Sequence, residues 1–553
     1  MPELVDDVKS IVLDYVRPPN PRFQHGINEL RFHVLHHSDI QALCLVSKSW
    51  NHVATATLYN NITIDIQSQG SQLACFEKCM YQGALHNLRF AKRLRASDWQ
   101  GSGREPERAR QEDILRVLKL FPNNRLCSLR YSSVLPFSAV CIDYLNQYQV
   151  SIKDIHVAGC DPLALIGGSR RSLTAYFGME AKSHILFRFL RSLKPLESLT
   201  ISLPGGWNEL DNHAWDITLD PMAGNRVSTK SLTLPGCMPR SFGDKFQRMF
   251  DWSILTSLSF FEGNLWLVKD IMESQYESPD LRNLVHFQCY TLDYIFEQDT
   301  LILYEFFKMT ESLRHVLLSI SGLTYLPVDT PERLDIEYTT RGHYFALWPL
   351  RNRLLTMVWH DAGQERPLDK KSLDCICRSF ASLQELGFAA PQAFDAKADK
   401  ESLWNEDLLE YLAPLSHVKT LRMVHLYQKF TESEDGDERF WPQHQTTANI
   451  QAFATLLFQW AHSYCPQFEV FVWGLYEEVK VVKGAQPWKS TGDASKFVPE
   501  LFFMKKLLHG QNGAIQITAS FTTRSRVRAD FPELLLPKSD PGFDELARAA
   551  FGH

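Results

Sequence analysis

Few residues in this chain are spaced in a way that supports catalysis or phosphate binding. The stretch LIGGSRRS, residues 165–172, could bind an anion through its backbone amides and the following Arg170 and Arg171. A Gly-Gly-Ser sequence is also typical of a plain turn, and we favour that interpretation. The sequence contains no Gly-x-Ser-x-Gly elbow, no phosphate loop ending in Gly-Lys-Ser and no His-Glu-x-x-His helix. We therefore expect no enzymatic activity in this chain.

The cysteines and histidines do not form a metal site at sequence level. Two close cysteine pairs occur, Cys75 with Cys79 and Cys375 with Cys377, and neither has a second pair at zinc-site spacing. Three histidines could share a helix face: His33, His36 and His37. No carboxylate or thiolate cluster lies near them to complete a site. We expect no metal and no cofactor, and scattered cysteines of this kind indicate reduced thiols in the cytoplasm or nucleus.

Length and charge narrow the class of protein. A chain of 553 residues exceeds the size of a single compact core, so several domains or an elongated repeat array is expected. The formal net charge is −6, and the basic run over residues 89–110 is interleaved with acids, which is typical of a solvated surface. The acidic N-terminus is not a secretory signal, and no apolar stretch is long enough to span a bilayer. We expect neither nucleic acid nor membrane as a partner.

Two helices are predicted at residues 39–58, and they carry one apolar stripe. In DIQALCLVSKSW, residues 39–50, a side chain at Ser38 or Asp39 can cap the first helix, and Ile40, Leu43 and Val46 recur at helical spacing. Trp50 opens the second helix. Upstream, residues 2–15 form another amphipathic helix that begins at Pro2 and ends before RPPNPRF. On periodicity alone, these helices would be interpreted as an ordinary hairpin packed on the chain's own core.

The ordered combination of these residues resembles an F-box, the three-helix module that begins Leu-Pro-x-Glu and continues Asp-Leu-x-x-Leu-x-x-Val-x-x-x-Trp. The resemblance covers about 60 residues and implies docking on a Skp-type adaptor and, through it, on a cullin-type (SCF) ubiquitin ligase. The residues it assigns to the adaptor contact are Pro2, Leu4, Val5, Val8, Asp39, Ile40, Leu43, Val46, Lys48 and Trp50.

The two halves of the F-box-like motif are separated by residues 17–38, where the family has a short connection. We interpret this segment as an insertion. A rival alignment starts the module at INELRFHVL, residues 27–35, with Glu29, Leu30, Val34 and Leu35, but it lacks the proline. The first helix is thus either 2–15 or within 27–37, whereas the assignment of 39–50 is common to both alignments.

A short motif, apolar-x-x-apolar-x-apolar, recurs along the rest of the chain. Copies begin at Leu126, Ile152, Leu196, Thr229, Leu255, Leu281, Leu313, Leu383, Val418 and Phe468. Leu126 to Ile152, Thr229 to Leu255 and Leu255 to Leu281 are each 26 residues apart, within the period of leucine-rich repeats. Wider gaps elsewhere indicate loop insertions. The alternative is a generic α/β domain with scattered short strands.

Cysteines support the repeat interpretation. Counting the motif's first residue as position one, Cys160, Cys237 and Cys289 each fall at position nine, where the leucine-rich repeat places an inward-turned Asn or Cys. The segment resembles a degenerate leucine-rich repeat, an arrangement that follows an F-box in many fungal-type proteins. The fold class expected is α/β, in which all-α F-box-like helices precede an irregular solenoid with a parallel sheet.

The expected organisation has four parts. Residues 1–60 form the F-box-like domain, 61–120 a helical connecting segment, 121–530 the repeat domain and 531–553 a C-terminal tail. The function implied is a non-catalytic substrate-recognition subunit of a ubiquitin ligase, in the cytoplasm or nucleus, with an unknown protein as substrate. The alternative is a repeat scaffold for protein–protein interaction, in which the N-terminal helices only cap the solenoid.

Alternation along each strand predicts the surface that binds the target. Positions four and six are expected in the core, and positions three, five and seven on the exposed concave face. The target-binding residues predicted from this register are His156, Thr200, Thr233, Ser259, Phe261, Phe287 and Arg422. Phe261 and Phe287 would lie side by side, as an anchor for a partner or under a covering loop.

Overall fold

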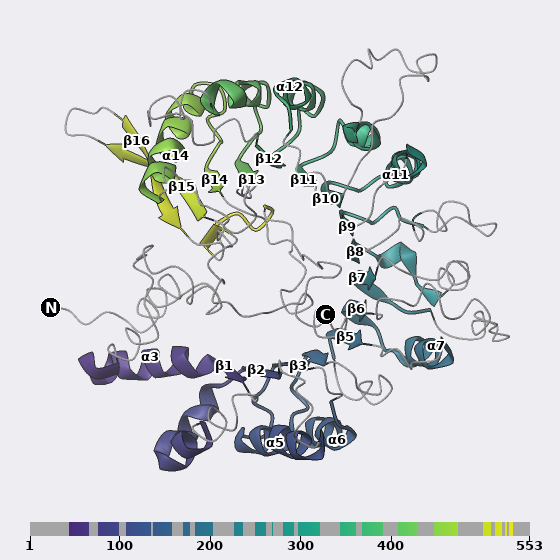
Figure 1. Ribbon diagram of the computed structural model, residues 1–553, viewed down its shortest axis with the longest axis vertical. Coiled ribbons are helices and arrows are strands. Elements are labelled where there is room, and N and C mark those ends of the chain that lie inside the picture. The colour runs from purple at the N-terminus through teal and green to yellow at the C-terminus, as the bar shows by residue number, and fades with distance from the viewer. Residues whose placement is uncertain are drawn as a thin grey trace, which may run out of the picture.

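The chain winds into a solenoid whose strands form one continuous sheet. The computed structural model describes residues 44–65, 76–98, 107–133, 137–157, 170–176, 183–202, 226–235, 249–261, 268, 280–291, 297–320, 343–360, 368–390, 408–427, 447–473, 501–509, 515–522, 526–527 and 530–534. Within these, sixteen strands pair strictly in chain order. Figure 1 shows them lining the inner side of an open arc, with the helices along its outer side. The inner side is therefore the concave face of the sheet.

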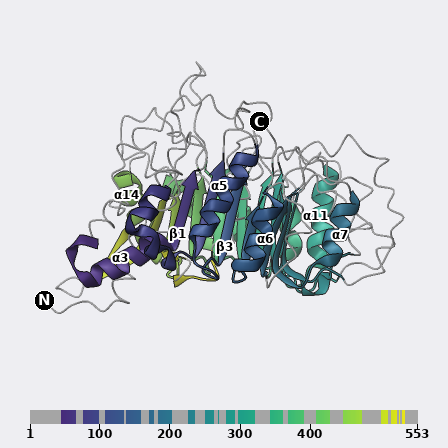
Figure 2. The same ribbon diagram turned by 90° about the horizontal axis from the view of Figure 1, so that it is seen from below.

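Strands β1 to β14 pair in parallel, whereas β15 pairs antiparallel with both β14 and β16. Their bounds are β1 Asn61–Asp65, β2 Arg93–Asp98, β3 Ser128–Ser133, β4 Asp154–Val157, β5 Ser172–Tyr176, β6 Leu196–Ser202, β7 Thr229–Pro235, β8 Ser257–Phe261, β9 His286–Thr291, β10 His315–Ile320, β11 Thr356–His360, β12 Glu385–Ala389, β13 Met423–Tyr427, β14 Val470–Trp473, β15 Leu501–His509 and β16 Ile515–Thr522. Figure 2 shows the strands upright and side by side behind helices α5 and α6.

Amphipathic helices connect many of the strands and cover the outer face. They are α3 Lys48–Asn60, α5 Glu107–Leu120, α6 Ala139–Tyr148, α7 Ser183–Ser192, α11 Glu297–Met309, α12 Lys370–Ser379 and α14 Thr447–His462, with shorter turns at Leu85–Phe90, His343–Leu350 and Ala413–His417. Helix α12 illustrates the local cause. The Asp369 side chain caps it by accepting from Ser372 N at 2.9 Å, and Leu373, Ile376 and Cys377 recur at helical spacing and are buried.

One backbone carbonyl in each coil fixes the register of the next. The carbonyl of Val285 accepts from the amides of Arg314 and His315, both at 3.0 Å. The carbonyl of Arg314 in turn accepts from Leu355 at 2.7 Å and Thr356 at 3.1 Å. The same double contact recurs from coil to coil. The residue whose amide is the second donor to the carbonyl therefore marks equivalent positions in the coils. We number that residue, the first of each strand from β9 to β14, as position three of its coil.

Positions four and six of each strand point outward into one core that runs the length of the arc. This core joins Leu129, Leu199, Leu232 and Leu258 at position four, all at most 1% exposed, to the apolar faces of the helices. Burying a side chain of this size stabilises the fold by about 1.5–3 kcal/mol. A mixed α/β fold with a long parallel sheet, as expected from the sequence, is confirmed.

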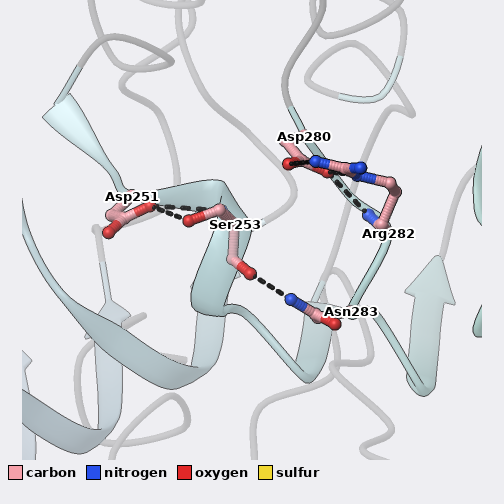
Figure 3. Close-up of polar contacts among 5 residues, drawn as sticks. All are labelled: Asp251, Ser253, Asp280, Arg282 and Asn283. Carbon is pink, nitrogen blue, oxygen red and sulfur yellow. Dashed lines mark hydrogen bonds and ion pairs between the residues drawn. The ribbon is translucent and has the colours of Figure 1, made fainter.

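Side chains in the turns before the strands tie neighbouring coils together. Between β8 and β9, Asn283 Nδ2 donates to the carbonyl of Ser253 at 2.6 Å, while Asp251 accepts from the Ser253 hydroxyl at 2.6 Å (Figure 3). Asp280 and Arg282 pair in the same turn, and these hydrogen bonds lower the pKa of Asp280 to about 2. Elsewhere Thr420, Ser382 and Ser151 donate to carbonyls of the preceding coil.

The C-terminal end of the sheet contacts α14 through polar side chains. Gln451 Nε2 donates to the carbonyl of Ala519 at 2.9 Å, and Gln459 Nε2 donates to the carbonyl of Ile517 at 3.0 Å. Between them, Thr455 Oγ1 accepts from the amide of Ala519 at 3.0 Å. These three residues are spaced by four, so they lie on one face of α14 and follow the outer edge of β16.

The structure differs from the expected register in two coils. Leu284 and Leu421 occupy position one, three residues later than Leu281 and Val418, which the motif search placed there. Leu281 and Val418 are nevertheless buried, at 2% and 0% exposure, because the turn before each strand also packs on the core. The search also missed the coils of β5 and β11. In the coil of β5 a buried arginine, Arg170, occupies position one.

The remaining boundaries can be compared only where the chain is described. The range 61–120, expected as a helical connection, contributes β1 and β2 to the sheet as well as α5. Residues 1–43, with most of the F-box-like segment, lie outside the described residues, as do Cys160 and Cys237. Among the described residues, no helix is both long and apolar enough to cross a membrane.

Candidate functional site

Small hydroxyl side chains cover the concave face of four neighbouring strands, β5 to β8. Position three is serine in all four, and position five is threonine or serine: Ser172, Ser198, Ser231 and Ser257, with Thr174, Thr200, Thr233 and Ser259. Adjacent strands lie about 4.8 Å apart, so each set forms a regular row across the sheet. Thr174, Ser257 and Ser259 are buried, at 3%, 9% and 6% exposure. The other five side chains are partly exposed, and each hydroxyl can both donate and accept a hydrogen bond.

The position-three row continues into a hydrogen-bonded chain across β9 to β13. The rings of His286 and His315 stack with centroids 4.6 Å apart and planes 14° from parallel. His315 Nδ1 lies 2.9 Å from Thr356 Oγ1, and this hydroxyl donates to Glu385 Oε2 at 3.3 Å. Because the hydroxyl has one proton to donate, His315 Nδ1 carries the proton on its side. The other oxygen of Glu385, Oε1, lies 2.8 Å from His425 Nε2.

Burial sets the electrostatics of this polar row. Thr356, Glu385 and His425 are at most 1% exposed, so the carboxylate depends on the hydroxyl and the imidazole for its hydrogen bonds. Burial, together with the adjacent His286, lowers the pKa of His315 to about 4. Burial also lowers the pKa of His286. Both stacked rings are therefore neutral at pH 7, which removes charge repulsion between them.

The centre of this polar row, from Thr356 to His425, is buried. The hydroxyl of Thr356 lies beside a carboxylate and an imidazole, the partners of an activated nucleophile, but Thr356 is 0% exposed and no substrate can reach it. In the part of the chain that the structure describes, no group of three His, Cys, Asp or Glu residues could hold a metal ion. The row therefore forms a buried polar link from β10 to β13.

The residues predicted to bind the target separate into three groups. Thr200, Thr233 and Ser259 occupy position five, on the concave side of the sheet. Thr200 and Thr233 are partly exposed, whereas Ser259 is buried at 6% exposure. The backbone places His156 at position five of β4 and Phe261 at position seven of β8. Their side chains lie outside what the structure describes.

Phe287 and Arg422 correct the predicted site. Phe287 occupies position four of β9, is 0% exposed and packs in the core against Phe306, with ring centroids 5.1 Å apart. It cannot pair with Phe261 on the concave face, because the register shift of three residues reverses its side of the sheet. For the same reason Cys289 lies at position six rather than nine, and it is buried. Arg422 lies at position two, just before β13, rather than at position five.

His425 takes the position that was expected for Arg422, and the sequence search missed it together with Thr356 and Glu385. The available signal was a polar residue at the first position of a strand, as Thr356 is in β11 and Glu385 is in β12. That signal required the register of four strands that are far apart in sequence.

A C-terminal segment lies over the concave face at the last parallel strands. Val527, Phe531 and Leu534 pack with Met423, Val470, Val472 and Phe502 in a cluster separate from the main core. Arg422 forms ion pairs with Glu533 and, at 3.6 Å, with Glu469. Its guanidinium also lies 4.9 Å from the centre of the Phe531 ring. We call residues 526–534, described at 526–527 and 530–534, the C-terminal strap.

At the other end of the chain, the described part of the adaptor motif is strongly exposed. Ser47 caps α3 by accepting from the amide of Trp50 at 3.2 Å, and the half-buried Trp50 packs on Val53 and Ala54. Leu45 and Val46, on the helical turn 44–46, are 87% and 63% exposed. Lys48 is also exposed. The other predicted adaptor-binding residues, from Pro2 to Leu43, lie outside the described residues.

Comparisons with known proteins give no family for this chain. No protein-family model and no curated protein matches it. Among solved structures, a Bacteroides fragilis protein determined by a structural-genomics consortium is 12% identical over 67% of this chain and 68% of its own. The TM-score of 0.20 is too low for that protein to inform the function.

Proposed function

We propose that this chain is the non-catalytic substrate-recognition subunit of a cullin-type ubiquitin ligase. Its N-terminal helices dock on a Skp-type adaptor, and the concave face of the solenoid binds the target protein. The observation that carries the proposal is the exposure of Leu45 and Val46 within the F-box-like motif. Neighbouring exposed apolar side chains can form part of a protein interface, and these two lie within the F-box-like motif.

The geometry around the motif supports a contact made by this face. Trp50 and Cys44 pack toward Val53 and Ala54, so Cys44 anchors the turn 44–46 to α3 while Leu45 and Val46 stay exposed. The sheet begins at Asn61, directly after α3 ends at Asn60. A helix joined to the first strand without a linker would hold an adaptor at a fixed angle to the concave face.

The experiment replaces the exposed apolar pair by acids. Leu45→Asp with Val46→Asp places two charges in the proposed contact and should abolish co-purification with a Skp-type adaptor, because unpaired buried charge is strongly unfavourable. Leu507→Asp with Leu508→Asp is the matched control, since these leucines of β15 are 47% and 48% exposed. The control should retain the adaptor. Ile40→Asp with Leu43→Asp should also abolish adaptor binding.

Two results would contradict the proposal. Adaptor binding by the Leu45→Asp, Val46→Asp variant at the level of the control would refute docking through this face. A wild-type chain that is folded and does not bind an adaptor would refute the ubiquitin-ligase function and favour a scaffold.

A further inference from the structure

The C-terminal strap packs on the concave side of the last parallel strands. Met423 and Val470 hold position three of β13 and β14, and Val472 holds position five, so their side chains face the concave side. Met423 follows Glu385 in the position-three row, which makes this surface continuous with the polar row. The strap therefore covers one end of the face that we propose for target binding.

The contacts of the strap are those of a short bound peptide. Three apolar side chains, Val527, Phe531 and Leu534, are at most 8% exposed and enter the concave surface together. One acid, Glu533, pairs with Arg422 at the rim. The strap's internal hydrogen bonds are local, from the amide of Phe531 to the carbonyl of Val527 at 2.8 Å and from Leu534 to Phe531 at 3.1 Å.

The described strap pairs with no strand and adds no residue to the main core. The parallel ladder of β13 and β14 and the packing of α14 are formed without it. Release of the strap would therefore leave the hydrogen bonds of the sheet in place. It would expose a concave apolar surface next to one arginine, which is complementary to an apolar and acidic peptide.

We propose that the concave surface of β13–β15 is a peptide-binding site, which the C-terminal strap holds in cis as a stand-in for the target. The target segment would carry an aliphatic residue, an aromatic residue four positions later, and an acid followed by an aliphatic residue, as in Val527, Phe531, Glu533 and Leu534. This inference rests on the proposed function, because it names the class of target segment that the concave face accepts.

Tethering makes the strap a competitor of the target. A segment joined to its own site by a short connection has an effective concentration on the order of millimolar. A target must therefore either bind more tightly than the strap or arrive when the strap is open. Peptides that bind this site more weakly than the strap are displaced by it. The strap thereby makes the receptor selective without additional contacts to the target.

The test uses the full chain and a fluorescein-labelled peptide of residues 526–534, RVRADFPEL. In the variant Phe531→Ser with Leu534→Ser, the strap loses two of its three apolar anchors, and the peptide should bind. The wild-type chain should bind the peptide at least tenfold more weakly, because its own strap competes. A control peptide carrying the same two serine substitutions should not bind to either chain.

Charge reversal tests the assigned contact. Arg422→Glu in the open variant should weaken binding of the peptide several-fold, and a peptide carrying Glu533→Arg should restore it. Absence of peptide binding to an open variant that melts like the wild type overturns the proposal. A fall in the melting temperature of the whole chain also overturns it, because the strap is then part of the core.

Hydrogen exchange of the wild-type chain provides a measurement that needs no substitution. The amides of Phe531 and Leu534 should exchange at least tenfold faster than those of β14, because the strap opens locally. Equal protection would overturn the inference. Adaptor binding is measured separately, so a failure of peptide binding with intact adaptor capture contradicts only this inference and not the proposed function.

Discussion

The partly buried pair of stacked histidines, His286 and His315, makes the stability of the central coils dependent on pH, and His315 allows this dependence to be measured. In the unfolded chain a histidine has a pKa near 6.5, whereas in the folded chain the pKa of His315 is about 4. Between these values the unfolded state binds a proton that the folded state does not. The free energy of unfolding should therefore fall as the pH falls from about 7 to 4, and level off below that range.

The size of the effect follows from these two pKa values. At pH 5 the difference destabilises the folded state by at most about 2 kcal/mol, and at pH 7 by about 0.2 kcal/mol. Replacement by glutamine removes the titrating ring and keeps a donor for Thr356 Oγ1. Between pH 7 and pH 5, the free energy of unfolding of His315→Gln should therefore fall by about 2 kcal/mol less than that of the wild type.

Hydrogen exchange of the β10 and β11 amides is the appropriate assay. Repeat arrays often open in parts rather than all at once, so a local opening free energy is better defined than a global one. His52→Gln, in the exposed part of α3, serves as the control and should leave the pH dependence of these amides unchanged. Identical losses of protection in the wild type and in His315→Gln at pH 5 would refute the electrostatic reasoning.

Three further outcomes follow from burial. Phe287→Ala should lower the free energy of unfolding by about 3–5 kcal/mol with no selective loss of target binding, as chemical denaturation would show; a stability change below about 1 kcal/mol would contradict its place in the core. Cys289, whose pKa burial raises to about 12, should react with a maleimide far more slowly than the exposed Cys79, and equal rates by mass spectrometry would contradict this assignment. Glu385→Ala leaves His425 and Thr356 without their acceptor and should destabilise β12 and β13 by about 1–3 kcal/mol, measurable by local hydrogen exchange, whereas unchanged protection would show that the pair is not stabilising.

The repeat architecture could be predicted from the sequence because each coil must bury the same few positions. Leu126, Ile152, Leu196, Thr229 and Leu255 marked their coils correctly, and the strands that follow begin two or fewer residues later. The parallel sheet followed from this spacing. Equally, alternation within a strand was sufficient to place Thr200, Thr233 and Ser259 on the concave face.

The register failed where the turn repeats the apolar spacing of the strand. Leu281, Leu284 and Phe287 are spaced by three, and all are buried, so the motif fits equally well at two starting points. Val418, Leu421 and Val424 present the same ambiguity. Only the pairing of His286 with Ser257 and of Met423 with Glu385 resolves it, and that pairing depends on neighbouring coils.

The coil of β5 was missed for a different reason. Arg170 holds position one there, and its guanidinium donates to the carbonyl of Ile152 at 2.6 Å and to Asn146 Oδ1 at 2.9 Å. A charged residue at this position contradicts the apolar pattern until its partners are known. The polar row could not be predicted either, because His315, Thr356 and Glu385 become neighbours only when β10, β11 and β12 pair in the sheet.

The contact between α14 and β16 has a consequence for how the molecule behaves among copies of itself. The sheet ends at β16, and an open final strand would accept an extended segment of another chain. Gln451, Thr455 and Gln459 occupy the backbone groups of Ile517 and Ala519 that such a segment would need. One face of a helix thus terminates the sheet and protects this end of the solenoid against growth into a filament.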